Sequence, residues 1–390
     1  MPWKTTSEQE QRFHLVTQWG AGVPVKDLCR RFKVSRQTAH KWRRRFQLGR
    51  LPGLQNRSRR PHRLARRTSR LWLERLRRRR RQHPTWGARK LHHGLRADFG
   101  WRGLPAVTTI SRWLKRWGLT RGRRRRPRGP VLWRARVTGA NYCNDLWTVD
   151  FKGCYKTGDG TRVDGLTVRD LFSRYGLCVV LLRGTKLAPT RREFVKVFRK
   201  YGLPRRIRCD NGTPFGGAGP TGLTRLSAWW VKLGIQVEFT TPGRPCENGA
   251  HEQFHRVYKA EVARRPALRQ VGQQRRSTRW LRHYNEVQPH EALGMRTPGS
   301  LYRPSPRPLP AQTKSWEYEA RWQRCWVRGN GEITLQGKRR FVGEAFVRDY
   351  VGLKALSAGV WRVHFGPVVI GDLHAQEVGN LRTAQYRRKK

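Results

Sequence analysis

Residues 146–284 contain short apolar runs rich in β-branched residues and segments with helical spacing. The strand-like runs are 146–151, 163–168, 177–182, 207–210 and 235–241. The segments with helical spacing are 189–201, 223–233, 248–264 and 273–284. Three successive strands favour antiparallel pairing, whereas strands that alternate with helices favour parallel pairing. The order predicts an α/β domain over residues 141–300, with a mixed sheet and helices on both of its faces.

The N-terminal residues 1–50 predict a separate, smaller helical domain. Two short helical segments are joined by a tight turn, and Ser35 is a suitable N-cap for the second of them, residues 35–46. Polar and basic side chains occupy the exposed side of this segment. A basic second helix after a tight turn is typical of a helix-turn-helix, although a small helical bundle with a basic surface is the alternative. The candidate DNA-binding residues are Arg36, Gln37, His40 and Lys41.

Four further regions complete the predicted organisation. Residues 62–120 repeat the helical pattern in segments 68–82, 86–99 and 106–117, which predicts a second domain that resembles a helix-turn-helix. A basic linker, 121–140, follows. Short β-like runs separated by glycine predict a small β-barrel over residues 313–380, and residues 381–390 form a basic tail.

The charge balance identifies the kind of partner. Lys and Arg total 85 against 25 Asp and Glu, which gives a formal net charge of +60. Such a field attracts polyanions, and an imbalance spread over the whole chain predicts nucleic acid as the partner. The chain has no apolar stretch of about 18 residues and its N-terminus lacks a signal-peptide core, so we expect a cytoplasmic protein without a membrane partner. Its seven scattered cysteines, without a C-x-x-C pair, predict neither a disulfide framework nor a cysteine zinc site.

Three carboxylates carry the candidate chemistry. Asp150 ends an apolar strand, Asp210 ends another, and Glu252 lies in the first turns of a helix. Considered separately, two of these residues have structural interpretations. Asp210 before Asn-Gly is typical of a turn, and Glu252 in a first helical turn is typical of a residue that interacts favourably with the helix dipole. If they converge, their mutual repulsion favours a divalent cation, and Mg²⁺ prefers such hard oxygen ligands. Two ions in one site would serve an in-line displacement without a protein nucleophile.

The order and setting of these residues resemble a known family. The matching motifs are Trp147-Thr148-Val149-Asp150, Asp210-Asn211-Gly212, Pro245-x-x-Asn248-Gly249-x-x-Glu252, Tyr284-Asn285, Pro289-His290-x-Ala292-Leu293-Gly294 and Thr297-Pro298. They resemble the integrase core of retroviral integrases and of insertion-sequence DDE transposases, whose families also carry the flanking domains predicted here. The resemblance implies an RNase H-like fold and a Mg²⁺ or Mn²⁺ site at Asp150, Asp210 and Glu252. It further implies cleavage and strand transfer of double-stranded transposon ends into target DNA, within a homo-oligomeric synaptic complex.

One spacing departs from the family pattern. The gap between Asp210 and Glu252 is 41 residues, longer than is usual, and the glycine-rich residues 216–224 look like a loop insertion. Glu247 fits the usual gap better, but the motif favours Glu252. Arg256 and Lys259 follow on the same helix face, and the resemblance suggests that they grip DNA; surface charge on a basic helix is the alternative.

Three other functions are weaker interpretations of the same sequence. His251-Glu252-x-x-His255 satisfies the zinc motif of metalloproteases, but a third ligand and a peptide cleft are not indicated. A tyrosine recombinase would use H-x-x-R, which occurs at His40 and His93, yet such matches are expected by chance in an Arg-rich chain. A DNA-binding regulator that has lost catalysis would not be expected to keep all three carboxylates.

Overall fold

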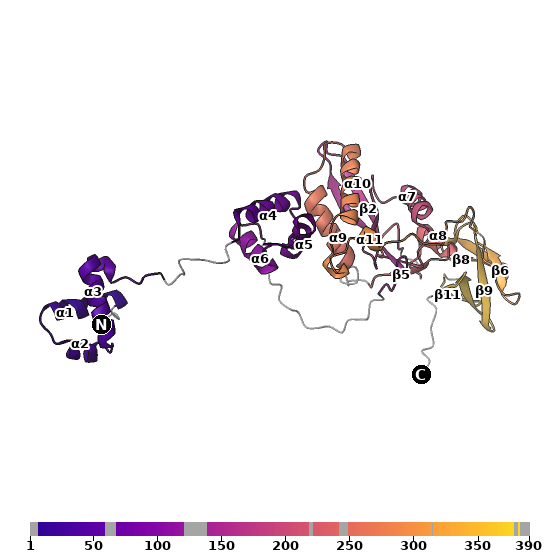
Figure 1. The fold of residues 1–390 in the computed structure, drawn as a ribbon. Coiled ribbons are helices and arrows are strands. Elements are labelled where there is room, and N and C mark those ends of the chain that lie inside the picture. Colours follow the sequence, from indigo (N-terminus) through magenta and orange to yellow (C-terminus); the bar gives the residue numbers. More distant parts are fainter. Residues whose placement is uncertain are drawn as a thin grey trace. The chain divides into compact units, whose positions relative to one another are not determined.

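The computed structural model describes residues 7–58, 68–120, 139–217, 221–241, 249–313, 315–377 and 381–382 (Figure 1). Two units, Met1–Arg67 and Thr68–Lys390, form compact bodies, and each is described by itself. Several predicted features lie outside the described residues: the stretch 121–128, most of the basic tail, Glu247, and part of the predicted loop insertion.

The first unit consists of three helices, α1 (Glu8–Gly20), α2 (Val25–Arg31) and α3 (Arg36–Gly53). Ser35 caps α3, since its hydroxyl accepts a hydrogen bond from the Thr38 amide. Leu28, Ala39 and Trp42 are buried between the helices. The predicted N-terminal helix-turn-helix arrangement is therefore confirmed. The third helix runs past the predicted end at residue 46 and is interrupted at Arg50, whose φ is +47°.

The second unit begins with the three predicted helices of the second helical domain, α4 (Arg70–Gln82), α5 (Ala88–Phe99) and α6 (Val107–Arg116). Their buried stripes meet in one cluster, which contains Trp72, Trp86, Leu91 and Ile110. The exposed face of α4 is strongly basic, so only a narrow apolar side of this helix is available for packing.

A five-stranded mixed sheet forms the centre of the second unit, as predicted. Its strands are β1 (Leu146–Lys156), β2 (Arg162–Asp170), β3 (Gly176–Leu182), β4 (Arg206–Cys209) and β5 (Gln236–Phe239). The order in space is β3-β2-β1-β4-β5. The pairs β1–β2 and β2–β3 are antiparallel, whereas β1–β4 and β4–β5 are parallel. This arrangement places the first residues of β1, Leu146–Thr148, beside β4.

Helices cover both faces of this sheet. On one face, α7 (Leu187–Tyr201) and α8 (Arg225–Lys232) bury Phe194, Phe198 and Trp230 against Trp147 and other strand residues. On the other face, Val179 packs with residues of α9 (Gly249–Tyr258), its π-helical continuation η2 (Lys259–Ala263), and α10 (Gln270–Glu286). Two short segments, η3 (Glu291–Leu293) and α11 (Pro298–Leu301), follow α10. The alternation of side chains along each strand lets one sheet support two cores.

The C-terminal region is built from strands, but the prediction of a closed β-barrel is not confirmed. Among the described residues, β11, β10, β9 and β6 form an open sheet in that order, and β7 pairs only with β8. Their apolar side chains are buried together with Leu223, Ala228 and Val231 around α8, so this face is covered without closure of the sheet. The bounds are β6 (Gln323–Trp326), β7 (Glu332–Leu335), β8 (Lys338–Phe341), η4 (Glu344–Phe346), β9 (Tyr350–Ser357), β10 (Val360–Phe365) and β11 (Val368–His374).

Candidate active site and metal centre

Asp150 lies within β1, on the sheet face that α9 covers; the strand continues to Lys156 and does not end at Asp150 as predicted, because pairing with β2 extends it. Alternate side chains of a strand point to opposite faces, so Trp147 and Val149 enter the core with α7 and α8, whereas Thr148 and Asp150 face α9. The side chain of Asp150 is 26% exposed, which leaves one route to solvent open. The strand places a carboxylate at the edge of a packed core, where a partner must stabilise its charge.

Asp210 follows the last residue of β4. Because Thr148 of β1 pairs in parallel with Arg208 of β4, continuing the register by two residues puts Asp210 level with Asp150. The Asn211 side-chain amide donates a 2.6 Å hydrogen bond to the Thr240 carbonyl, which ties this turn to the end of β5. The motif Asp210-Asn211-Gly212 therefore fixes a carboxylate beside the end of the neighbouring strand.

Glu252 occupies the first turn of α9 and is exposed. The neighbouring helix positions His251, Phe254 and His255 are buried against the sheet and α10. Because a helix turns about 100° per residue, Glu252 lies at the border between this packed side and solvent. The helix thus supplies a carboxylate from above the sheet, whereas Asp150 and Asp210 come from the strands.

The electrostatics of Asp150 connect the three carboxylates. Burial raises the pKa of Asp150 to about 7, with further contributions from the negative charges of Asp210 and, less strongly, Glu252. The backbone N–H of Phe151 and the ammonium of Lys152 act in the opposite direction. Partial desolvation also raises the pKa of Asp210, although this residue is exposed. The charges of Asp210 and Glu252 thus both act on Asp150, and carboxylate oxygens are donors that suit a divalent cation. Among the described residues, the group of three side chains whose ligand atoms lie within 4.8 Å of one another is Asp150, His251 and His255.

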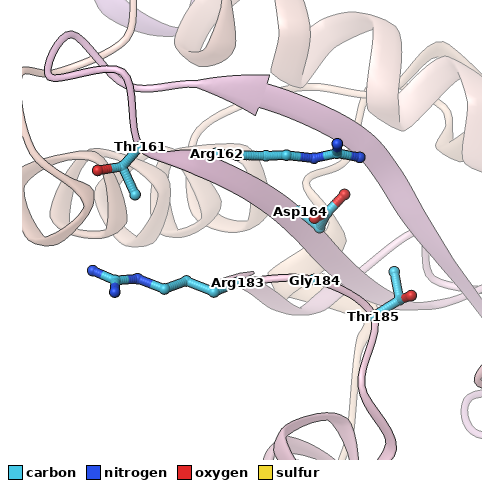
Figure 2. Close-up of a pocket in the computed structure, with 6 residues that line it drawn as sticks. All are labelled: Thr161, Arg162, Asp164, Arg183, Gly184 and Thr185. Carbon is cyan, nitrogen blue, oxygen red and sulfur yellow. The ribbon is translucent and has the colours of Figure 1, made fainter.

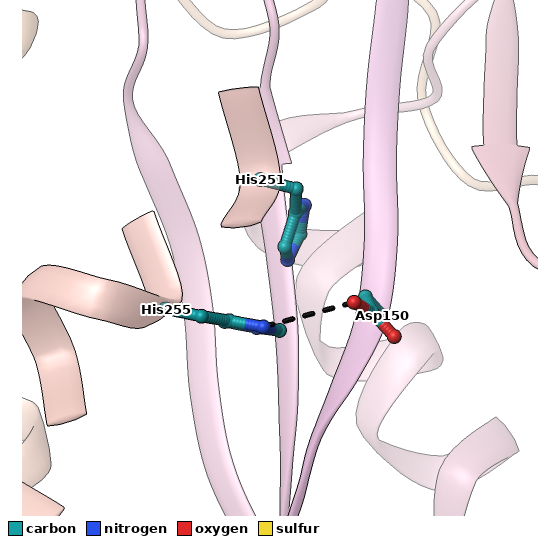
Figure 3. A group of neighbouring side chains, drawn as sticks. All are labelled: Asp150, His251 and His255. Carbon is teal, nitrogen blue, oxygen red and sulfur yellow. Dashed lines mark ion pairs between the residues drawn. The ribbon is translucent and has the colours of Figure 1, made fainter. Parts of the chain in front are cut away.

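A buried polar network connects Asp150 to two histidines of α9 (Figure 3). The Thr167 hydroxyl, opposite Asp150 on β2, donates to the Asp150 carbonyl at 2.8 Å. The same oxygen lies 2.7 Å from Nε2 of both His251 and His255. His251 Nδ1 lies 2.8 Å from the Thr148 hydroxyl, and His255 Nδ1 lies 3.6 Å from Asp150 Oδ2.

This network bears on the metalloprotease alternative. The two histidines of H-E-x-x-H would have to offer one free ring nitrogen each to a zinc ion. Both nitrogens of His251 are in hydrogen bonds, so His251 has none to offer. The spacing of the two histidines instead places both rings on the side of α9 that packs on Thr148 and Thr167. Sequence reasoning missed Thr167 altogether and noticed His255 only through this other motif.

Basic side chains surround the carboxylates. Arg256 and Lys259 are exposed beyond Glu252. Lys152, two residues after Asp150 on β1, was not predicted; burial and the nearby charge of Lys259 lower its pKa, while Asp150 acts in the opposite direction. Lys152 and Lys259 therefore lie near each other, although they come from different elements. Together they form a positive margin beside the carboxylates.

The candidate DNA-binding residues of the first unit, Arg36, Gln37, His40 and Lys41, are all exposed on α3. The opposite side of the same helix buries Ala39 and Trp42. The His40 ring packs edge-on against Trp19, with 4.9 Å between centroids, so this exposed side chain is held in place.

A separate hollow of about 430 Å³ lies at the beginning of β2 and just after β3 (Figure 2). Its lining residues are Thr161, Arg162, Asp164, Arg183, Gly184 and Thr185. None of the predicted site residues lines it.

Within the part of the chain that the structure describes, no helix has the length and apolar character needed to cross a membrane.

Comparison with known domain families agrees with this architecture. Residues 141–245 and residues 233–298 each match a family model described as an integrase core domain, and residues 6–55 match a homeodomain-like domain. These matches show that the chain contains an integrase core region and, before it, a homeodomain-like domain of the helix-turn-helix type.

The relatives found by sequence come from bacterial insertion elements. A 39.2 kDa protein of insertion element IS476 from Xanthomonas euvesicatoria is 28% identical over 222 residues, which cover 56% of this chain and 61% of the relative. A 31.7 kDa protein of insertion element IS407 from Burkholderia multivorans is 26% identical over 217 residues, 53% of this chain and 76% of the relative. The match thus spans less than two thirds of the first relative's length.

Two solved structures resemble parts of the chain. The HTLV-2 integrase catalytic core domain in complex with magnesium has 17% identity and a TM-score of 0.34, and the match covers 42% of this chain and 99% of that domain. A chain of the simian T-cell lymphotropic virus intasome in complex with a PP2A regulatory subunit has 15% identity and a TM-score of 0.38, with coverage of 80% and 100%. Likenesses this weak carry no conclusion about function.

Proposed function

We propose that this protein is a transposase that binds the ends of its transposable element and cuts and joins DNA strands with Asp150, Asp210 and Glu252. The observation that carries the proposal is the placement of these acids in the region that matches an integrase core: Asp150 and Asp210 lie on or just after adjacent parallel strands, and Glu252 lies on the helix that covers Asp150. Asp150 is partly buried and the charge of the exposed Asp210 acts against its ionisation, and a structural role alone gives no reason for that cost.

The three acids fit a site for Mg²⁺ or Mn²⁺. Asp150 would offer oxygens from β1, Asp210 from the end of the adjacent strand β4, and Glu252 from α9. When bound, divalent cations would supply the positive charge that activates the attacking oxygen and stabilises the leaving oxygen of a phosphodiester displacement. The carboxylates would form no covalent bond with the DNA, since their role would be to bind and position the cations.

The remaining side chains of the site would position the DNA. Lys152, Arg256 and Lys259 present positive charge beside the acids, where it would attract the phosphates that flank the reacting bond. The exposed face of α3, with Arg36, Gln37, His40 and Lys41, would enter a major groove at the transposon end. Because cutting two ends and joining them to a target requires more than one active site, the working form would be a homo-oligomer on double-stranded DNA in the bacterial cytoplasm.

Cleavage of defined DNA tests this proposal. The substrate is a duplex that carries the terminal inverted repeats flanking the gene, and its control is a duplex with scrambled repeats. We expect strand cleavage at the repeat ends and joining to a second duplex, only when Mg²⁺ or Mn²⁺ is present. Specific binding without metal-dependent cleavage would instead support the alternative of a non-catalytic DNA-binding regulator.

A further inference from the structure

The hydrogen bonds around Thr167 determine which nitrogen of each histidine carries a proton. A hydroxyl has one proton to donate and two lone pairs to accept with. The Thr167 hydroxyl donates to the Asp150 carbonyl, which can only accept. Both ring nitrogens at 2.7 Å must therefore donate to Thr167, so His251 and His255 each carry their proton on Nε2.

This assignment shows that the two histidines differ in whether Nδ1 is already in a hydrogen bond. The Nδ1 atom of His251 accepts a hydrogen bond from the Thr148 hydroxyl, so this ring is saturated. The Nδ1 atom of His255 has a lone pair that lies 3.6 Å from Asp150 Oδ2. That distance is too long for a hydrogen bond. In the neutral tautomer that carries its proton on Nε2, His255 can therefore offer Nδ1 to a cation.

A neutral imidazole beside a carboxylate is a common pair of metal ligands. The candidate ligand atoms of Asp150, His251 and His255 all lie within 4.8 Å of one another. Two ligands of one cation, with bonds of about 2.1 Å, are roughly 3–3.5 Å apart, close to the observed separation of His255 Nδ1 and Asp150 Oδ2. A metal-bound histidine usually donates its other N–H to a fixed acceptor, which here is Thr167.

We propose that His255 Nδ1 is a nitrogen ligand of the cation that Asp150 holds, so that the site is a mixed carboxylate–imidazole site. This inference rests on the proposed metal-binding role of Asp150. His251 is excluded as a ligand and serves to hold Thr148 and Thr167 in place. Because imidazole favours transition metals over Mg²⁺, the site binds Mn²⁺ or Co²⁺ more tightly than a site of three carboxylates would.

Pulsed EPR of Mn²⁺ bound to the full chain, without DNA, tests the proposal directly. We expect nitrogen modulation from a directly bound imidazole, which changes when the protein is labelled with ¹⁵N-histidine. In His255→Gln, the modulation disappears and Mn²⁺ affinity falls by roughly tenfold or more, while Mg²⁺ affinity changes less. Gln at this position can still reach Thr167 but offers nothing at the place of Nδ1.

His251→Gln is the matched control, because it alters the same network without touching the proposed ligand. Circular dichroism first establishes that both variants are folded. Mn²⁺ bound to the wild type in an Asp150-dependent manner, but without nitrogen modulation, would overturn the role of His255 and leave the proposed function intact. Disappearance of the modulation in folded His251→Gln rather than in His255→Gln would also overturn it, because the nitrogen ligand would then be His251. Mn²⁺ binding that is absent, or unaffected by Asp150→Asn, would overturn the metal site itself.

Discussion

Helices α3 and α9 both carry residues of the proposed function, but they present them in opposite ways. On α3 the functional candidates point to solvent, and the buried side is apolar, with Ala39 and Trp42. On α9 the buried side is partly polar, because His251 and His255 pack against Thr148 and Thr167 beside the apolar Phe254. An exposed basic face can bind a polyanion with little preparation, whereas a buried polar face must be satisfied by specific hydrogen-bond partners. The exposed face of α3 is therefore a binding surface, whereas the buried face of α9 is a polar site with fixed hydrogen-bond partners.

The largest expected effect is on the carboxylates of the core. We predict that Glu252→Gln, Asp150→Asn and Asp210→Asn each reduce metal-dependent cleavage and strand transfer by on the order of a thousandfold or more, since several kcal/mol of charge stabilisation is removed. DNA binding, which depends on α3, should survive. Cleavage assays and gel-shift titrations on the purified variants measure the two properties separately.

Glu247→Gln is the control for Glu252→Gln. The sequence predicts that Glu247 precedes the helix and interacts with its N-terminus, so its replacement should cost about 1 kcal/mol and leave activity within about tenfold. An active Glu252→Gln enzyme beside an inactive Glu247→Gln enzyme would transfer the third carboxylate role to Glu247.

A second prediction addresses α3. Replacing Arg36, Gln37 and His40 together by Ala should lower affinity for the transposon end by roughly 10- to 100-fold, and affinity for random DNA much less, because base contacts carry the specificity. Fluorescence anisotropy with both duplexes measures this ratio. The exposed pair Lys26 and Arg30 on α2 provides a control of similar charge. Equal decreases on both duplexes would mean that the three residues contact only phosphates.

The basic stretches outside the described residues should act without sequence preference. Deleting residues 121–128 or 387–390 should flatten the plot of log affinity against log salt by about 0.9 for each phosphate that the shortened protein no longer binds. Binding to the repeat duplex at several salt concentrations gives the slope. An unchanged slope after both deletions would show that neither stretch binds the phosphate backbone.

The smallest expected effect is on stability. Folding raises the pKa of Asp150 to about 7, so its charge destabilises the metal-free fold increasingly as the pH rises from about 4 through 7. In EDTA, Asp150→Asn should therefore melt at least about 2 °C higher than wild type at pH 8, with no difference near pH 4. Adding Mg²⁺ should narrow the gap at pH 8, since only the wild type gains a bound ion. A variant that is less stable than wild type at pH 8 would contradict the burial of this charge.

The sequence alone was sufficient to predict the helices and strands of the core and to select the three candidate carboxylates. Short apolar runs predicted all five strands of the central sheet, because the residue pattern of a strand is a local property. Ser35 marked the beginning of α3 for the same reason, since its capping bond is made within the same turn. The motifs around Asp150, Asp210 and Glu252 identified the acids, although a one-dimensional pattern could not show that they interact.

Tertiary structure determined the features that depend on contacts between residues distant in the chain. The predicted barrel is an open sheet because its apolar face is covered by residues around α8, more than 90 residues earlier in the chain. Thr167 is an unremarkable residue of β2 until register places it opposite Asp150 and packing brings α9 onto it. Only then do one hydroxyl proton and two lone pairs determine which nitrogen of His255 is free. The residue pattern of a helix or strand can be recognised in the local sequence. The hydrogen bond between Thr167 and His255, which are 88 residues apart, is determined only by tertiary packing.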